Sequence, residues 1–275
     1  FNGPNNNITT ENGNSDPRIV RTGGGINFTR PYPANPYAPR PDLVVSLGLE
    51  YQHINVENDN GDLAPRSTEG TRLAYNPDGI DDLVFLKFGA SSDSRNNPLE
   101  PTSGSVLRIG VDQTLPLTGI VFNRIRANYS YYIPVEFINF GFTKGPQALA
   151  FNVQAGTILG NFPPYEAFAL GGSNSVRGYG DGEVGSGRSF FQATAEYRFP
   201  IISFLGGAIF FDYGTNLGSG GAVIGNPTRI RNLPGNGYGY GVGVRINSPL
   251  GPIRIDYGIN QDGNSQINFG IGQKF

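Results

Sequence analysis

The chain has 275 residues, a formal net charge of -2 and no Cys, Met or Trp. Zero Cys removes disulfides and thiol chemistry, and the near-neutral charge provides no basic field for nucleic acid. No apolar run approaches the roughly 18 to 20 residues of a membrane-spanning helix, which excludes a helical membrane protein. The mean hydropathy of -0.27 looks soluble, but a β-barrel gives the same average because lipid-facing and lumen-facing residues alternate.

Alternating apolar and polar residues predict a series of strands, each near the length of about 9 to 11 residues that crosses a bilayer at a tilt. Leu43, Val45 and Leu47, for example, alternate with polar or small residues such as Ser46 and Gly48. The segment 82–90 is apolar and alternates less cleanly. In chain order, the N-terminal candidates are 19–30, 43–53, 82–90, 105–113, 123–133 and 148–157.

The C-terminal part of the chain repeats the pattern more clearly, in segments 189–199, 208–214, 238–247, 253–260 and 266–275. In the last segment, the apolar residues share one face of a period-two pattern. Ending on an aromatic residue at the apolar position is typical of bacterial outer-membrane barrels. We therefore interpret these residues as a C-terminal β-signal on the lipid-facing side: Ile267, Phe269, Ile271 and Phe275.

These segments predict an all-β fold, an antiparallel transmembrane β-barrel that extends over residues 1–275. They amount to about eleven strands, whereas bacterial outer-membrane barrels close with even numbers. We interpret Phe1 and the polar run 2–17 as the stump of one further strand and its loop, and expect preceding strands outside this piece. A soluble β-sandwich is the alternative, but it rarely places charged residues opposite a full apolar row in almost every strand.

The connections alternate in length, as such barrels require. The long ones, 57–81, 160–188 and 217–237, are expected to face outward. The short ones, 134–147, 200–206 and 248–252, are expected on the periplasmic side together with the chain end. Aromatic residues are expected in interfacial girdles: Tyr129, Tyr131, Tyr132, Tyr197, Tyr238, Tyr240 and Phe275. Inward charges predict a wet lumen: Arg108, Arg124, Arg126, Arg198, Arg245, Arg254, Glu50, Asp112, Glu196, Asp212 and Asp256.

The connection 160–188 contains more apolar residues than a solvated surface loop needs, among them Phe168, Leu170 and Tyr179. We therefore expect it to fold back into the lumen. Arg177 would then need anionic partners, because an unpaired buried charge costs about 3 to 5 kcal/mol. The next two predicted strands offer Glu196 and Asp212 on their inward faces.

Residues 171–179 resemble the loop-six signature of the BamA-like superfamily of outer-membrane insertases and translocation pores. The core of that signature is Val176-Arg177-Gly178-Tyr179. Residues 195–200 and 210–214 resemble the two strands that follow the loop in this family, and residues 93–104 and 247–252 match as well. The resemblance implies that Arg177 contacts Glu196 and Asp212. The glycine-rich runs 218–220 and 235–241 are most similar to cyanobacterial members and to their chloroplast import-channel relatives.

The family has periplasmic POTRA modules before a sixteen-strand barrel. Neither these modules nor about the first five strands are visible in this sequence, which suggests the C-terminal 11 to 12 strands of such a barrel. The resemblance implies an integral protein of a Gram-negative, cyanobacterial outer membrane, in contact with lipid. It would insert unfolded β-barrel precursors or pass polypeptides, with accessory assembly proteins as further partners. A passive porin and a two-partner-secretion transporter are the alternatives.

Signals for other chemistry are weak, so we expect no enzyme, no catalytic residue, no cofactor, no metal and no nucleic-acid partner. Residues 180–185 fit G-x-G-x-x-G, but neither the strand before it nor the helix after it that dinucleotide binding requires is predicted. The single His53 lies at a strand end, and no zinc-ligand spacing accompanies it. The acidic run 57–62 lacks the full calcium-loop pattern, and we interpret it as a solvated loop.

Overall fold

The computed structural model describes residues 8–11, 16–33, 42–138, 145–248 and 251–275. The proposed strand stump at Phe1 lies outside the described residues, as do parts of the connections 134–147 and 248–252. Within the described ranges, eleven strands form one antiparallel sheet in which chain neighbours pair. The strands are β1 (Arg18–Tyr32), β2 (Leu43–Glu57), β3 (Ile80–Asp93), β4 (Gly104–Thr114), β5 (Phe122–Val135), β6 (Gln147–Gly160), β9 (Ser189–Ile202), β10 (Leu205–Thr215), β11 (Asn236–Ile246), β12 (Ile253–Asn260) and β13 (Ser265–Ile271).

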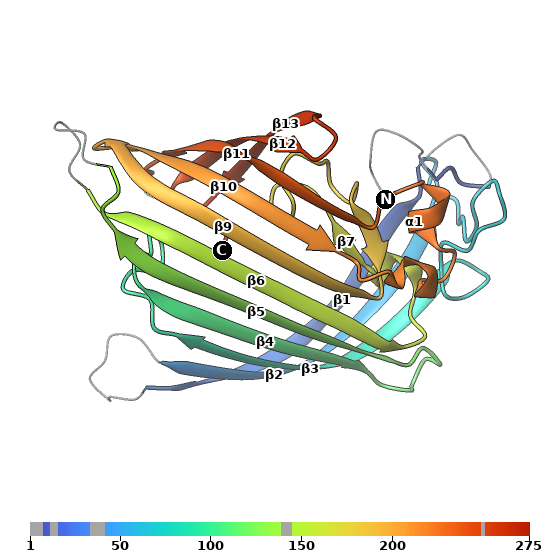
Figure 1. Cartoon of the computed structure of the whole chain (residues 1–275). Helices are drawn as coiled ribbons and strands as arrows, with labels where there is room; N and C mark the ends of the chain where they lie inside the picture. The colour runs from blue at the N-terminus through green and yellow to red at the C-terminus, as the bar shows by residue number, and fades with distance from the viewer. Residues whose placement is uncertain (1–7, 12–15, 34–41, 139–144, 249–250) are drawn as a thin grey trace.

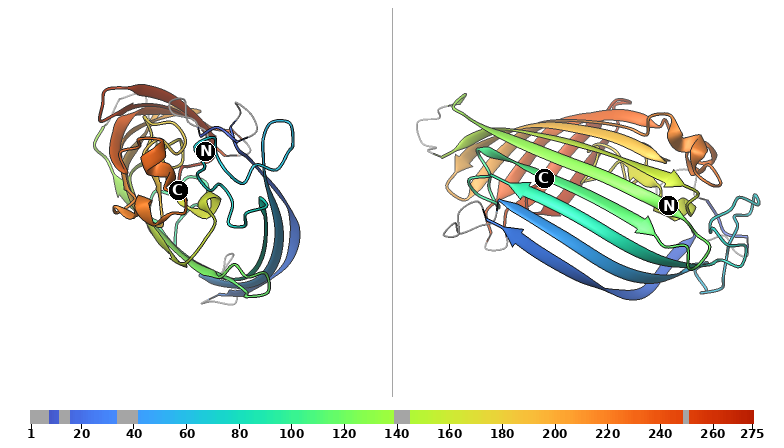
Figure 2. Two further views of the ribbon diagram at one scale, coloured as in Figure 1. Left: turned by 90° about the vertical axis from the view of Figure 1, so that its right-hand side faces the viewer. Right: turned by 90° about the horizontal axis from the view of Figure 1, so that it is seen from below.

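The sheet curls into a partial barrel, with the connection between β6 and β9 inside the curve (Figures 1 and 2). Strands β1 and β13 are the two ends of the strand order, and the described residues contain no pairing between them, so the sheet is open. Each predicted strand segment corresponds to a strand of this sheet, and most strands extend a few residues beyond the predicted limits, but the last one, predicted to 275, ends at Ile271. None of the helices in the described ranges has the length and apolarity needed to cross a membrane.

The two faces of the sheet differ as the alternation predicts, and β10 illustrates the difference. Ile209, Phe211 and Tyr213 point outward and are 51%, 47% and 37% exposed. Phe210 and Asp212, between them in sequence, point inward and are 3% and 0% exposed. An apolar outer face that is exposed to this degree suits lipid rather than water.

The connections separate by length only in part: three are long as predicted, but those after β4 (115–121) and β12 (261–264), at the same end of the antiparallel sheet, are short. The connections after β2, β6 and β10 are long and lie at one end of the barrel, where they contain the short elements η2 (Ser219–Ala222) and α1 (Pro227–Ile230). Beneath these loops, apolar side chains from several strands form a core: Ile54, Leu83, Phe85, Ile120, Phe122, Ile158, Phe162 and Val223. This core fills the long-loop end of the curved sheet.

The prediction for the end of the chain is wrong in part. Ile267, Phe269 and Ile271 face outward at 56%, 68% and 73% exposure, but β13 stops at Ile271. Gly272 then adopts a positive φ of 82°, and the following residues turn inward. Phe275 is 9% exposed and stacks on the 1% exposed Tyr132, with ring centroids 6.2 Å apart. Phe275 and Tyr132 therefore lie inside the barrel and belong to no interfacial girdle.

Candidate functional site

The segment 160–188, here called the lumen loop, lies within the curve of the sheet (Figure 2). It starts with the short helix η1 (Pro164–Glu166) and continues in a small hairpin of β7 (Phe168–Leu170) and β8 (Gly185–Gly187). Leu170, Val176, Tyr179 and Val184 pack together as a buried cluster within the loop. The loop thus has a small core of its own, which explains why it contains apolar residues.

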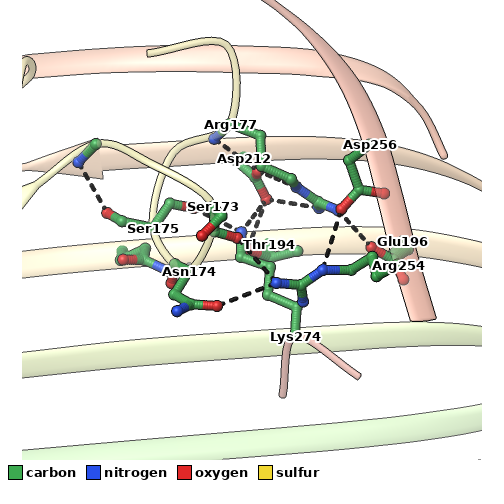
Figure 3. Close-up of polar contacts among 12 residues, drawn as sticks. Ser173, Asn174, Ser175, Arg177, Thr194, Glu196, Asp212, Arg254, Asp256 and Lys274 are labelled. Atoms are coloured by element: carbon green, nitrogen blue, oxygen red, sulfur yellow. Dashed lines mark hydrogen bonds and ion pairs between the residues drawn. The ribbon is translucent and has the colours of Figure 1, made fainter. Parts of the chain in front are cut away.

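Arg177 projects from the tip of the lumen loop into three carboxylates on the barrel wall (Figure 3). Its Nε lies 2.7 Å from Asp212 Oδ2, and its Nη1 lies 2.9 Å from Glu196 Oε2. The same Nη1 also donates to Asp256 Oδ2 at 3.1 Å. Arg177 and all three carboxyl side chains are fully buried. The structure therefore brings Arg177 together with Glu196 and Asp212, and adds Asp256 on β12.

Two glycines allow the loop tip to approach the wall this closely. Gly178 has a φ of +95°, a left-handed conformation that L side chains rarely adopt. A Cβ on Gly239 of β11 would lie only 1.8 Å from the Arg177 carbonyl oxygen. Gly239 belongs to the alternating glycines of β11, whose inward positions leave room for the loop tip.

Further cations complete what we call the charged cluster: Arg177, Glu196, Asp212, Asp256, Arg198, Arg245, Arg254 and Lys274. Lys274, just after β13, donates to Asp212 Oδ1 at 2.7 Å and to the Ser175 carbonyl oxygen at 2.6 Å. The guanidinium of Arg177 also lies 3.4 Å from the ring centroid of Phe210. The end of the described chain and the loop tip therefore share the carboxylate of Asp212.

Burial and neighbouring carboxylates shift the pKa values of Arg177 in the lumen loop and of Lys274 near the end of the chain. Burial alone lowers the pKa of Arg177, but Asp212 and Glu196 more than offset this effect and raise its pKa above the ordinary value. Burial lowers the pKa of Lys274 to about 8, although Asp212 acts in the opposite direction. Arg177 therefore stays charged at any physiological pH, whereas Lys274 titrates close to neutrality.

The base of the lumen loop has a second ionic contact, which we call the Glu166 anchor. Glu166 in η1 is 5% exposed. Its Oε1 accepts from Arg21 Nη1 of β1 at 2.7 Å, and its Oε2 accepts from Arg124 Nη1 of β5. Arg124 also pairs with Asp112 on β4 at 3.0 Å. One buried carboxylate thus ties the loop to strands on the N-terminal side of the sheet.

The residue before Glu166 extends this contact to the start of β3, which in turn holds the connection that precedes it. The Tyr165 hydroxyl donates to Asp81 Oδ2 at 2.7 Å, and the Arg21 guanidinium lies 5.3 Å from the Tyr165 ring centroid. Asp81 is fully buried and also accepts from the backbone amides of Tyr75 and Asn76. Burial and the neighbouring Asp81 raise the pKa of Tyr165, so its hydroxyl remains a donor.

Sequence reasoning did not identify Asp256 or Lys274 as partners of the loop tip, nor the Glu166 anchor. The sequence does contain a signal for Asp256, because the alternation of β12 predicts that its side chain points into the lumen. The sequence contains no such signal for Glu166, because an irregular connection has no periodic pattern from which the direction of a side chain could be predicted. Only the fold brings Glu166 to Arg21, 145 residues away in sequence.

The weaker sequence signals turn out to be local contacts. In the run 180–185, the Glu183 carboxylate accepts from the Gly180 amide at 2.5 Å, as part of a turn within the loop. His53 Nδ1 lies 2.8 Å from Asp82 Oδ1 on the neighbouring strand β3. In the acidic run 57–62, the Asn58 side-chain oxygen accepts from the amides of Asn60 and Asp62. Each of these residues has a structural partner.

The curled antiparallel sheet, its apolar outer face and an ion-paired loop in its lumen define this chain as part of a transmembrane β-barrel. Comparison with known proteins identifies the family to which the chain belongs. A model of the Omp85 superfamily domain matches residues 4–275. The chain therefore belongs to the Omp85 superfamily, which agrees with the resemblance to BamA-like proteins seen in the sequence.

Named relatives are chloroplast outer envelope proteins. Outer envelope protein 80 of Arabidopsis thaliana is 34% identical over 263 residues, which cover 94% of this chain and 33% of that protein. Protein TOC75 of Pisum sativum is 32% identical over 213 residues, covering 76% of this chain and 26% of that protein. The chain thus spans about a third or less of the length of these two relatives.

Among solved structures, BamA from Haemophilus ducreyi lacking POTRA domains 1–3 superposes with a TM-score of 0.62. The alignment covers 98% of this chain and 56% of that chain at 18% sequence identity. At this identity the likeness concerns the fold. It places the open sheet described above on part of a larger barrel.

Proposed function

We propose that this chain is the C-terminal part of an outer-membrane pore that inserts β-barrel precursors or passes polypeptides across the membrane. The observation that carries the proposal is the lumen loop, whose Arg177 is buried against Glu196, Asp212 and Asp256. Membership of the Omp85 superfamily supports it, as does the identity with chloroplast outer envelope proteins. The activity requires no chemical step, no nucleotide and no cofactor.

In this proposal the lumen loop, residues 160–188, acts as an internal brace. Its tip is held by strands β9, β10 and β12, and its base by β1 and β5, so the loop spans the curved sheet from within. A brace of this kind keeps a partial or gated barrel in shape while an edge strand pairs with another strand. The outward residues Ile267, Phe269 and Ile271 of the edge strand β13 would contact lipid, or pair with a further strand.

A passive porin, the alternative suggested by the sequence, is less well supported. A diffusion pore needs an open aqueous path, whereas the lumen loop and the apolar core beneath the long connections occupy the interior. A two-partner-secretion transporter is consistent with the same loop, because it also passes a polypeptide. We propose in addition a cyanobacterial or related outer membrane, with the short connections and the chain end on the periplasmic side.

The test is reconstitution of the full-length protein that contains this chain into liposomes. A urea-unfolded β-barrel precursor is added, and its folding is followed by protease protection and by gel mobility without heating. The expected result is faster precursor folding than in empty liposomes, with the acceleration reduced in Arg177→Ala. Equal folding rates with and without the protein, together with free passage of small sugars, would instead identify a porin.

A further inference from the structure

The inner face of the short-connection end contains a cavity that the lumen loop does not occupy. We call it the mouth pocket. It has a volume of about 210 Å³. Arg198 of β9 and Arg245 of β11 contribute its cationic lining, with Gln273 beside them and apolar walls from Pro101 and Ala148. A cavity of this size accommodates roughly one amino-acid side chain.

Several buried polar atoms in this lining have no hydrogen-bond partner among the described residues. They are Nη1 and Nη2 of Arg198, Nε of Arg245 and Oε1 of Gln273. Arg198 is 9% exposed and Arg245 is 4% exposed. Buried polar groups are usually paired, so unpartnered guanidinium nitrogens at a cavity indicate a missing acceptor.

Arg198 is also fixed in place. Its Nε donates to Glu196 Oε1 at 2.8 Å, and its guanidinium lies 5.0 Å from the ring centroid of Phe275 and 5.7 Å from that of Tyr132. A guanidinium that stacks on aromatic rings and is held at Nε keeps both Nη groups at its free edge. That edge is the part of arginine that binds a carboxylate through two parallel hydrogen bonds.

The charge balance of the charged cluster favours an anion at this position. Five cationic side chains, Arg177, Arg198, Arg245, Arg254 and Lys274, share the three carboxylates of Glu196, Asp212 and Asp256. The carboxylate in the pocket lining, Glu100, is exposed and forms no ion pair with Arg198 or Arg245 among the described residues. Two of these cations, Arg198 and Arg245, line the pocket, so part of the surplus positive charge lies beside it.

We propose that the mouth pocket binds an acidic side chain of a polypeptide that enters the barrel from the short-connection end. The inference rests on the proposed function, which supplies the polypeptide. The Nη edge of Arg198 would hold the carboxylate, with Arg245 contributing charge, and the apolar walls would hold the methylene groups of the side chain. A lipid phosphate is the weaker fit, because the two arginines lie on the inner face of the sheet.

The binding test uses the purified full-length protein in detergent and two blocked tripeptides, acetyl-Gly-Glu-Gly-amide and acetyl-Gly-Gln-Gly-amide. Inorganic phosphate serves as a third probe. Calorimetric titration should show the glutamate peptide binding about tenfold more tightly than the glutamine peptide, the ratio expected from one charge-assisted contact. Arg198→Gln should remove this preference, whereas Arg198→Lys should retain part of it because the charge remains.

Arg126→Gln is the matched control, since Arg126 also lies on the lumen side but pairs with Asp112 at 2.8 Å, away from the pocket. Equal binding of the two peptides, or equal effects of Arg198→Gln and Arg126→Gln, would overturn the proposal. Phosphate binding at least as tight as that of the glutamate peptide would reduce the pocket to an inorganic anion site, which also contradicts it. Because titration involves no precursor folding, its failure is distinguishable from failure of the liposome assay.

Discussion

The two ends of the lumen loop are both held by buried ion pairs, but they differ in how completely water is excluded. At the tip, Arg177 and its three carboxylate partners are fully buried. At the base, the side chain of Glu166 is 2% exposed, while that of its partner Arg21 is 41% exposed. Since solvent weakens ion pairs, the tip is the firm attachment of the loop and the base is the one that releases more easily.

The difference matters because the tip of the lumen loop and the Glu166 anchor at its base hold different parts of the sheet. The tip contacts β9, β10 and β12, whereas the Glu166 anchor contacts β1 and β5. Any movement that widens the curve of the sheet must stretch the loop between these contacts. We expect the contact to Arg21 to separate first, while the tip stays in place.

The largest effect is expected from removal of the Arg177 side chain. Arg177→Ala leaves three buried carboxylates with fewer positive partners and should lower the free energy of unfolding by about 3 to 5 kcal/mol. Urea titration in detergent, read out by the mobility of unheated protein on gels, measures this change. Arg177→Lys keeps the charge but cannot reach all three carboxylates, so it should fall in between; wild-type stability in Arg177→Ala would refute the prediction.

Close packing of the loop tip can be tested without changing any charge. Gly239→Ala would place a Cβ 1.8 Å from the Arg177 carbonyl oxygen, and such overpacking costs about 1 to 3 kcal/mol. Gly24→Ala on β1 is the matched control, because a Cβ at that position meets no atom within 4 Å. The same urea titration should separate the two variants, and equal stability would show that the tip does not press on β11.

The Glu166 anchor should contribute less than the tip. Glu166→Gln replaces a carboxylate shared by Arg21 and Arg124 with a neutral amide, and should cost about 1 to 2 kcal/mol after allowance for the exposure of Arg21. The substitution Glu69→Gln, at an exposed position of the long connection after β2, is the control and should have little effect. A loss in Glu166→Gln as large as that in Arg177→Ala would mean that the two ends are equally firm.

The smallest effect concerns the pH dependence contributed by Lys274. Its pKa is lowered from 10.5 to about 8 by burial, so between these values the unfolded chain binds the proton more strongly than the folded one. Stability contributed by this residue is therefore lowest below pH 8 and rises as the pH increases toward 10.5. Urea titrations at pH 7 and pH 9.5 should show a rise in the free energy of unfolding of the wild type that is absent in Lys274→Met. The same change with pH in both proteins would contradict the assignment of this pH dependence to Lys274.

The sequence predicts the sheet well because the period-two alternation is repeated in almost every strand, the segment 82–90 being the least clear, and it indicates which face meets lipid. It also predicts the loop tip, since Arg177 lies in a motif and Glu196 and Asp212 occupy inward positions of predicted strands. The period-two pattern places Phe275 on the lipid-facing side, because the pattern extends past Ile271 in the sequence. In the structure, the positive φ of Gly272 ends the strand and Phe275 is buried. The Glu166 anchor depends on contacts between distant segments that no local pattern records.

The most direct test of the two-anchor account is backbone hydrogen exchange across the lumen loop, compared in wild type, Arg177→Ala and Glu166→Gln. In the wild type we expect protection at the tip, where the Arg177 amide donates to Asp212 and the Gly172 amide donates to the Tyr179 carbonyl oxygen. Arg177→Ala should remove protection over residues 171–179, whereas Glu166→Gln should affect residues 164–168 and leave the tip protected. Fast exchange at the tip of the wild type, or the same pattern in both variants, would contradict the account.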